Sequence, residues 1–151
     1  MDWLRRTDAS TRDSGMGHFR VRVGVGRASG ERLVPIDALV DTGATYTWIP
    51  RGALESLGVS AEEERRFVLA DGREVRYPIA WIKIKIGDRV QPTIAVFGEP
   101  GSEPILGVVT LEEFLLAADP VSRRLIPVPG LLKRGASSAR VASKLAAPHC
   151  Q

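Results

Sequence analysis

The segment Asp41-Thr42-Gly43-Ala44 is the part of the chain best suited to acid–base chemistry. It follows a mostly apolar run at 36–40, so a carboxylate stands at the end of a predicted buried strand, directly followed by a hydroxyl and a glycine. This order suits an acid at the floor of a cleft, with hydrogen-bond donors nearby and a backbone bare enough for a close neighbour. The chain contains the segment once, so a second catalytic carboxylate would have to come from another subunit.

The composition of the 151-residue chain fits one domain with a sizeable core, because 44% of it is hydrophobic. Frequent Gly (15) and Pro (10) suit short strands and turns better than a helix bundle. The net charge of +3 reflects residues 131–151, which carry four basic residues and no acid, so the remainder lacks the basic surface of a nucleic-acid-binding domain. We expect a disordered lead over 1–16, one domain over 17–130, and a basic, disordered tail over 131–151.

The sequence predicts a cytoplasmic protein without metal or cofactor. The N-terminal residues lack the apolar core of a signal peptide, and no run approaches the ~18 apolar residues of a membrane-spanning helix. Cys150 is the only cysteine, so no intrachain disulfide can form, as is usual in reducing compartments. His18 and His149 are too far apart, and too poorly accompanied, to suggest a metal site. Because the sequence shows neither a signal peptide nor a membrane-spanning run, we also expect no membrane contact.

Alternating apolar residues predict most of the strands, and the second of these strands delivers Asp41. Pro92 favours an edge or a bulge in the last of them. A short helix is predicted between the second and third of these strands, after Ile49, with Pro50 at its first position and Gly58 at its C-terminal cap. The strands predicted from alternation cover residues 19–25, 33–40, 80–86 and 90–96.

A hairpin is predicted where residues 67–70 and 74–77 flank Asp71-Gly72, a strong two-residue turn signal. The charged residues 62–66 that precede it are expected to form a connector. The hairpin therefore stands between the aspartate-containing strand and the second half of the chain.

The end of the domain is predicted to hold a helix and two strands. Thr110 and Glu113 form a capping-box pattern, and an apolar stripe follows over 111–118. Asp119, which precedes a proline, is expected to stop this helix. Residues 121–128 can then form a last pair of short strands, giving a mostly-β fold with two short helices.

Residues 17–130 resemble the single-domain retropepsin-like aspartic proteases, and the cellular and bacterial members more than the viral ones. The matching pieces are the run 38–44 and, more than sixty residues later, Ile105-Leu106-Gly107 before a predicted helix. Either piece alone is a weak signal, but both in order around a glycine-containing hairpin are specific. The resemblance implies a retropepsin-like acid-protease barrel protomer with one active-site aspartate per chain.

The resemblance implies an aspartic endopeptidase that acts on extended polypeptides as a homodimer. Its dyad would consist of Asp41 from each of two subunits, on the two-fold axis of the dimer. Two carboxylates about 3 Å apart cannot both be ionised, so they share one proton. The ionised group would take a proton from water, and the protonated group would donate to the scissile carbonyl. Such chemistry needs neither a cofactor nor a metal.

The resemblance also implies roles for the neighbours of the aspartate. Thr42 would brace the dimer with hydrogen bonds under the dyad. Gly43 would let the strand approach the substrate and offer its carbonyl, and Ala44 would line the cleft. The step at 105–107 would pack beneath the active-site loop as support and take no part in the chemistry.

The hairpin takes the place of the flap in the resembled family. Asp71 and Gly72 would form its tip, which would close over an extended peptide, exclude water and hydrogen-bond the peptide backbone. Val68, Ala70 and Val75 would add an apolar lining. The tip lacks the glycine-rich run of the viral enzymes.

The chain departs from the viral pattern at Thr45 and Val108, where viral enzymes usually carry an Asp and an Arg that pair to stabilise the dimer. The dimer therefore needs another contact. The strands predicted within 121–128 are the candidate for a sheet shared between subunits.

Two other interpretations remain open. The Asp41 segment could be an ordinary turn at the end of a strand, because Asp and Gly are common in turns. Alternatively, the same dimeric barrel could have little or no activity and serve as a peptide-binding or oligomerisation module, which would bind extended peptides without turnover. Trp48 and Trp81 are expected to be packing or interface residues.

Overall fold

The computed structural model describes residues 18–132, so the predictions for 1–16 and for most of the tail at 131–151 lie outside the described residues. The described strands are β1 (Arg20–Arg27), β2 (Val34–Val40), β3 (Thr47–Pro50), β4 (Glu63–Val68), β5 (Glu74–Ile86), β6 (Arg89–Gly98), β7 (Ile105–Leu106), β8 (Leu116–Asp119) and β9 (Arg124–Pro127). The described helices are α1 (Arg51–Ser56) and α2 (Val108–Glu113).

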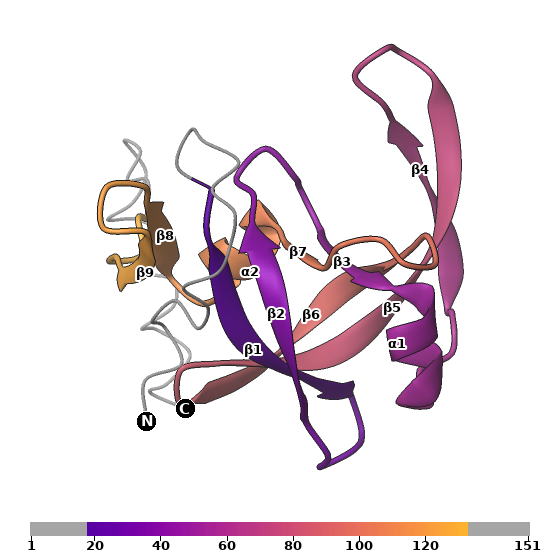
Figure 1. Cartoon of the computed structure of the whole chain (residues 1–151), viewed down its shortest axis with the longest axis horizontal. Coiled ribbons are helices and arrows are strands. Elements are labelled where there is room, and N and C mark those ends of the chain that lie inside the picture. The colour runs from indigo at the N-terminus through magenta and orange to yellow at the C-terminus, as the bar shows by residue number, and fades with distance from the viewer. Residues whose placement is uncertain (1–17, 133–151) are drawn as a thin grey trace, which may run out of the picture.

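One sheet dominates the described part of the chain (Figure 1). It has seven strands in the order β1-β2-β7-β3-β6-β5-β4, and a further pairing of β1 with β5 curls it into a barrel. β8 and β9 form a separate two-stranded sheet beside the barrel, at the left of Figure 1. The prediction of a mostly-β fold with two short helices is confirmed.

The barrel core is built from the alternation visible in the sequence. Val21, Val23 and Val25 of β1 have 0% exposure, and so do Ile82 and Ile84 of β5. Alternate residues of a strand face the same side, so both strands direct these side chains into the barrel, and Val25 lies opposite Ile84 where the two strands pair. Burial of these apolar side chains is the main source of stability for the barrel that carries the site.

The prediction of a connector over 62–66 is wrong for 63–66, because these residues belong to β4. β4 pairs with β5 over its whole length and includes a cross-strand ion pair, Arg66 Nε to Glu74 Oε1 at 3.4 Å. The hairpin projects from the barrel at the upper right of Figure 1, so charged side chains on it stay in water. The run of charged side chains is typical of a loop, but β4 pairs with β5 through backbone hydrogen bonds, which do not depend on those side chains.

The capping box predicted at Thr110 is also wrong. α2 begins earlier, with Gly107 as its N-cap and no side-chain cap, so Thr110 lies inside the helix and is fully buried. The helix ends at Glu113, because Leu115 adopts a left-handed backbone with φ 53°. No helix of the described residues is long and apolar enough to cross a membrane.

The last two strands lie earlier than predicted, at 116–119 and 124–127 in place of 121–128. Asp119 does not stop a helix but organises the turn of this hairpin. Its carboxylate accepts hydrogen bonds from the Val121 N–H (3.0 Å) and from the Ser122 hydroxyl (2.5 Å). These bonds lower the pKa of Asp119, with the Ser122 hydroxyl as the largest cause.

The prolines lie close to their predicted places. Pro50 is the N-cap of α1, one residue before the predicted position, and Gly58 follows the C-cap with φ +81°. Pro92 pairs with β5 only, because β3 joins β6 from Ala95 onward, so the prediction of an edge position is confirmed.

Candidate active site

Asp41 is the first residue after β2, and its position is fixed on both sides. Its backbone N–H donates to the Leu106 carbonyl (3.1 Å), and the preceding N–H of Val40 donates to the Phe19 carbonyl (2.8 Å). The side chain is half-buried. The carboxylate therefore emerges from a strand that is held between two neighbours.

The residues after Asp41 orient its carboxylate. The Gly43 N–H donates to Asp41 Oδ1 at 2.9 Å, and the Ala44 N–H donates to the Asp41 carbonyl at 3.1 Å. A Cβ at position 43 would lie 3.2 Å from Oδ1, so a larger residue would crowd the oxygen that this N–H binds. Thr42 and Gly43 are exposed in the protomer, and Ala44 is half-buried.

The step at Ile105-Leu106-Gly107 lies directly behind this loop. β7 runs parallel to β2 and pairs Leu106 with Val40, so both strands end together. Two hydrogen bonds then tie the loop to α2: the Val108 N–H donates to the Ala44 carbonyl (2.8 Å), and the Val109 N–H to the Thr45 carbonyl (2.9 Å). Position 108 therefore supports the loop through its backbone in this chain.

Gly107 has to be a glycine for a steric reason. A Cβ at this position would lie 2.4 Å from the carbonyl carbon and oxygen of Tyr46, and 2.9 Å from the Thr45 oxygen. Backbone atoms cannot move aside as flexible side chains can. This close approach lets β7 and α2 pack against the loop that carries Asp41, which is consistent with the supporting role predicted for the step.

The tip of the β4–β5 hairpin is a turn over residues 69–73. The Gly72 N–H donates to the Leu69 carbonyl (2.9 Å), and φ at Gly72 is +88°, where glycine is favoured. The Asp71 carboxylate accepts from the Arg73 backbone N–H (3.0 Å) and from its Nε (2.7 Å), and these bonds lower the pKa of Asp71. The turn is longer than the predicted two residues but contains both of them.

The predicted lining residues of this hairpin are open to solvent in the protomer. Val68 is 68% exposed, Ala70 is exposed and Val75 is half-buried. The hydrogen bonds described above join Asp41 to the step at 105–107. The hairpin is joined instead to β3, the strand that follows the Asp41 loop, and the contact is aromatic packing.

An aromatic cluster connects the β4–β5 hairpin to β3. Trp48 packs against Tyr77 (ring centroids 4.9 Å apart) and against Phe67 (5.8 Å), and Tyr46 packs against Phe67 (6.0 Å). The Arg65 guanidinium donates to the Tyr46 hydroxyl at 3.0 Å. The expectation that Trp48 is a packing residue is confirmed, and the cluster fixes the hairpin relative to the strand that follows Asp41.

Sequence reasoning missed this cluster as a unit. The available signal was the spacing of Tyr46 and Trp48, which places both rings on one face of a strand. Their partners lie in β4 and β5, and nothing local in the sequence links them. Trp81, by contrast, is 46% exposed, and its backbone N–H donates to the Glu62 carboxylate at 2.9 Å.

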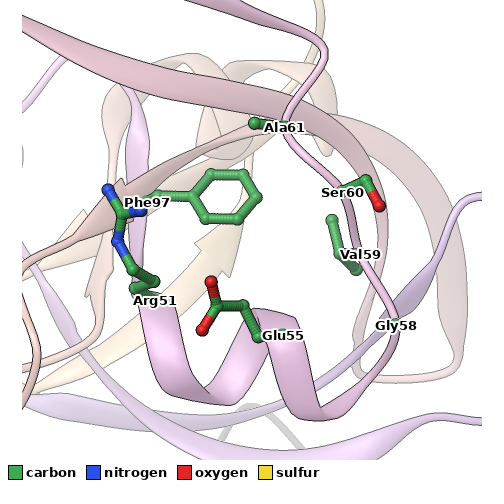
Figure 2. Close-up of a pocket in the computed structure, with 7 residues that line it drawn as sticks. All are labelled: Arg51, Glu55, Gly58, Val59, Ser60, Ala61 and Phe97. Carbon is green, nitrogen blue, oxygen red and sulfur yellow. The ribbon is translucent and has the colours of Figure 1, made fainter.

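A separate pocket of about 380 Å³ lies beside α1, as Figure 2 shows. The Phe97 ring faces it, the Arg51 guanidinium lies 6.0 Å from the centre of that ring, and the Glu55 carboxylate points toward the ring. Its lining includes none of the site residues predicted from the sequence. Among residues 18–132, no group of three or more His, Cys, Asp or Glu side chains is placed to hold a metal.

Comparison with known proteins agrees with this geometry. A family model described as aspartyl protease matches residues 21–110, which include Asp41 and Gly107. Among solved structures, the EIAV protease complexed with the inhibitor HBY-793 is similar, with a TM-score of 0.51 and 17% identity over 72% of this chain and 93% of that chain. At this identity the likeness shows the retropepsin-like fold, and the comparison with curated proteins gives no match. By the family match, this chain belongs to the aspartyl protease family.

Proposed function

We propose that this chain is an aspartic endopeptidase whose site is completed by a second copy. The observation that carries the proposal is the setting of Asp41. Its half-buried carboxylate ends a strand, one oxygen is held by the Gly43 N–H, and the loop is braced from behind by the step at 105–107. An acid that is both oriented and accessible fits general acid–base catalysis better than an ordinary turn does.

The proposed reaction uses two copies of Asp41 that share one proton. The ionised carboxylate takes a proton from a water molecule as the water oxygen attacks the peptide carbonyl carbon. The protonated carboxyl donates its proton to the carbonyl oxygen, which gives a tetrahedral diol. Proton transfer from the diol to the amide nitrogen then breaks the C–N bond and releases acid and amine. The Gly43 N–H keeps one carboxylate oxygen in place throughout.

The β8–β9 hairpin is the proposed dimer contact, with the strand positions corrected as above. Beside it lies an apolar groove of about 620 Å³. Leu131 and Leu132 on its wall are each 92% exposed, and Leu115 is 43% exposed, which is unusual for leucine side chains in an isolated protomer. The residues lining this groove include Leu115, Leu116, Val128, Leu131 and Leu132.

The position of this hairpin suits a dimer that brings two Asp41 loops together. The Arg123 side chain in its turn donates to the His18 carbonyl at 3.1 Å, directly before Phe19. Phe19 in turn accepts the hydrogen bond from Val40, the residue before Asp41. The hairpin and the Asp41 loop are therefore both bonded to the segment at 18–19, and the proposed dimer would use both. The exposed Thr42 would lie against its partner there.

The proposed substrate is an extended polypeptide. The flap would cover it, with Val68, Ala70 and Val75 providing an apolar lining, and peptide backbone groups would pair with the tip. The aromatic cluster between the flap and β3 offers further apolar surface. We therefore expect cleavage next to hydrophobic residues of unstructured chains.

The first test is cleavage of casein across about pH 3–8, with pepstatin as a probe of an acid dyad. Asp41→Asn should abolish cleavage and leave the fold intact. Asp37→Asn is the matched control, because Asp37 lies in the same strand but pairs with Arg22 (2.9 Å). Cleavage that survives Asp41→Asn would refute the assignment, and a dimer that binds peptide without cleaving it would favour the binding-module interpretation.

A mixing experiment tests whether the site is shared. Wild-type and Asp41→Asn chains are unfolded together, refolded at fixed total concentration and assayed. If each site needs one Asp41 from each protomer, an equimolar mixture retains about a quarter of the wild-type activity. If each protomer has its own site, it retains about half. The second result would refute the shared dyad without refuting the catalytic role of Asp41.

A further inference from the structure

Three fully buried threonine hydroxyls lie behind the active-site loop. Thr47 is in β3, Thr93 in β6 and Thr110 in α2, and each has 0% exposure. They are the buried polar residues of the described part of the chain. The Oγ1 atoms of Thr47 and Thr110 are 2.6 Å apart, and those of Thr93 and Thr110 are 2.8 Å apart. Three separate elements thus meet through a row of hydroxyl groups.

The ends of this row determine its direction. At one end, the Thr93 hydroxyl donates to Glu113 Oε1 at 2.7 Å, and an ionised carboxylate only accepts. Because each hydroxyl has a single proton, Thr110 must then donate to Thr93, and Thr47 must donate to Thr110. The Thr47 oxygen is left to accept at the other end, where the Gly107 N–H donates to it at 3.1 Å. Each group has a partner, and only one direction satisfies all of them.

The inner end of the row reaches the segment that holds Asp41. Gly107 is the glycine whose Cα lies against the Tyr46 backbone, and its neighbour Leu106 accepts the hydrogen bond from the Asp41 N–H. The outer end, Glu113, is the last residue of α2 and is exposed. A surface carboxylate is therefore connected through buried hydroxyl groups to the backbone beneath the catalytic loop.

We propose that Glu113 is a positioning residue, which aligns the Asp41 loop through the row of Thr93, Thr110 and Thr47. A hydroxyl that donates to a carboxylate becomes a better acceptor, so the charge on Glu113 strengthens each following bond as far as the Gly107 N–H. Without that acceptor, the three hydroxyl protons lose their single direction and the Thr47 oxygen is no longer reserved for Gly107. For catalysis this inference rests on the proposed function, but the alignment itself does not.

The test compares Glu113→Ala with Glu113→Gln, whose amide oxygen can still accept from Thr93. Glu55→Ala is the control, because it makes the same change on the other six-residue helix, outside the row. The amide resonances of Gly107 and Asp41 are followed by two-dimensional ¹H–¹⁵N NMR. We expect Glu113→Ala to shift the Gly107 amide proton upfield, Glu113→Gln to restore most of the shift, and Glu55→Ala to leave it unchanged.

Kinetics give the second readout. Glu113→Ala should lower kcat about tenfold with KM within about twofold of wild type, because a misaligned dyad impairs the reaction more than substrate binding. Thr93→Ser keeps the hydroxyl and should retain most of kcat. Thr93→Val removes the hydroxyl and should lower kcat. If Thr93→Val does not fold, the Glu113 variants still decide, because Glu113 is exposed.

Two results would overturn the inference. One is a Gly107 amide resonance that does not move in Glu113→Ala. The other is an equal change of the Gly107 shift and of kcat in Glu113→Gln and Glu113→Ala. If the wild-type chain cleaves nothing, the proposed function fails, and the NMR comparison alone still decides whether Glu113 positions the loop.

Discussion

Replacing Gly107 with alanine would test how tightly the step behind the active site is packed. The new methyl group would lie 2.4 Å from the Tyr46 carbonyl carbon and oxygen, far inside van der Waals contact. The obstructing atoms are backbone, so the strain can be relieved only by moving β7 and α2 away from the loop. That movement would stretch the bonds from Val108 to Ala44 and from Val109 to Thr45.

The expected loss of stability follows from these contacts. Inserting a methyl group into a packed interior typically lowers the free energy of unfolding by about 1–3 kcal/mol. Weakening these two backbone hydrogen bonds removes roughly 1 kcal/mol each. We therefore expect Gly107→Ala to lower the free energy of unfolding by about 3–5 kcal/mol, against about 5–15 kcal/mol for a typical domain. Activity should fall even where the variant remains folded, because the loop bearing Asp41 is displaced.

Urea unfolding at equal protein concentration measures this loss, because the stability of a dimer depends on concentration. Gly52→Ala is the matched control. Position 52 lies within α1, and a Cβ there would have no atom within 4 Å, so alanine should be neutral or stabilising by about 0.5–1 kcal/mol. If Gly107→Ala unfolds within about 0.5 kcal/mol of wild type, the steric reasoning about this glycine is wrong.

Two further predictions concern the flap and the terminal hairpin. Phe67→Ala should lower the free energy of unfolding by roughly 1–2 kcal/mol and raise KM, because the half-buried ring joins the hairpin to Trp48. Phe67→Leu should change both quantities less, as urea unfolding and peptide-cleavage assays would show. Ser122→Ala should raise the depressed pKa of Asp119 toward its usual 3.8, as a ¹³C titration of the carboxyl would show. The depressed pKa contributes stability that is present above pH ~4 and is lost as the pH falls through the folded-state pKa. Ser122→Ala should therefore lose less stability in acid than the wild type does. An unchanged titration of Asp119 would contradict the assignment.

Much of the fold could be predicted from local sequence because its signals act between near neighbours. The alternation in β1 and β2 reports which face each side chain takes, and it placed Asp41 at the end of a buried strand. The failures occurred where local patterns compete. Leu115 continues an apolar helical stripe, yet it ends α2 in a left-handed conformation because the chain turns there into β8.

The residues around the candidate site divide in the same way. The Asp41 segment and the step at Gly107 are visible as short motifs, because their chemistry depends on adjacent residues. The threonine row is not, since no pattern distinguishes Thr93, which bonds within the core, from a threonine on a surface turn. β4 was missed because its charges resemble a loop, and its pairing with β5 depends on backbone groups that the side chains do not reveal.

Local sequence alone is enough to indicate the family: a mostly-β chain, with Asp41 set between an apolar strand and a glycine, as the resemblance to the aspartyl protease family requires. Local periodicity and adjacent residues carry that information. Three features are visible only in the folded chain: how tightly Gly107 approaches Tyr46, how aromatic rings from three strands hold the β4–β5 hairpin, and how Glu113 reaches the Asp41 loop through buried hydroxyls. These contacts join residues distant in sequence, and they exist only once the barrel closes.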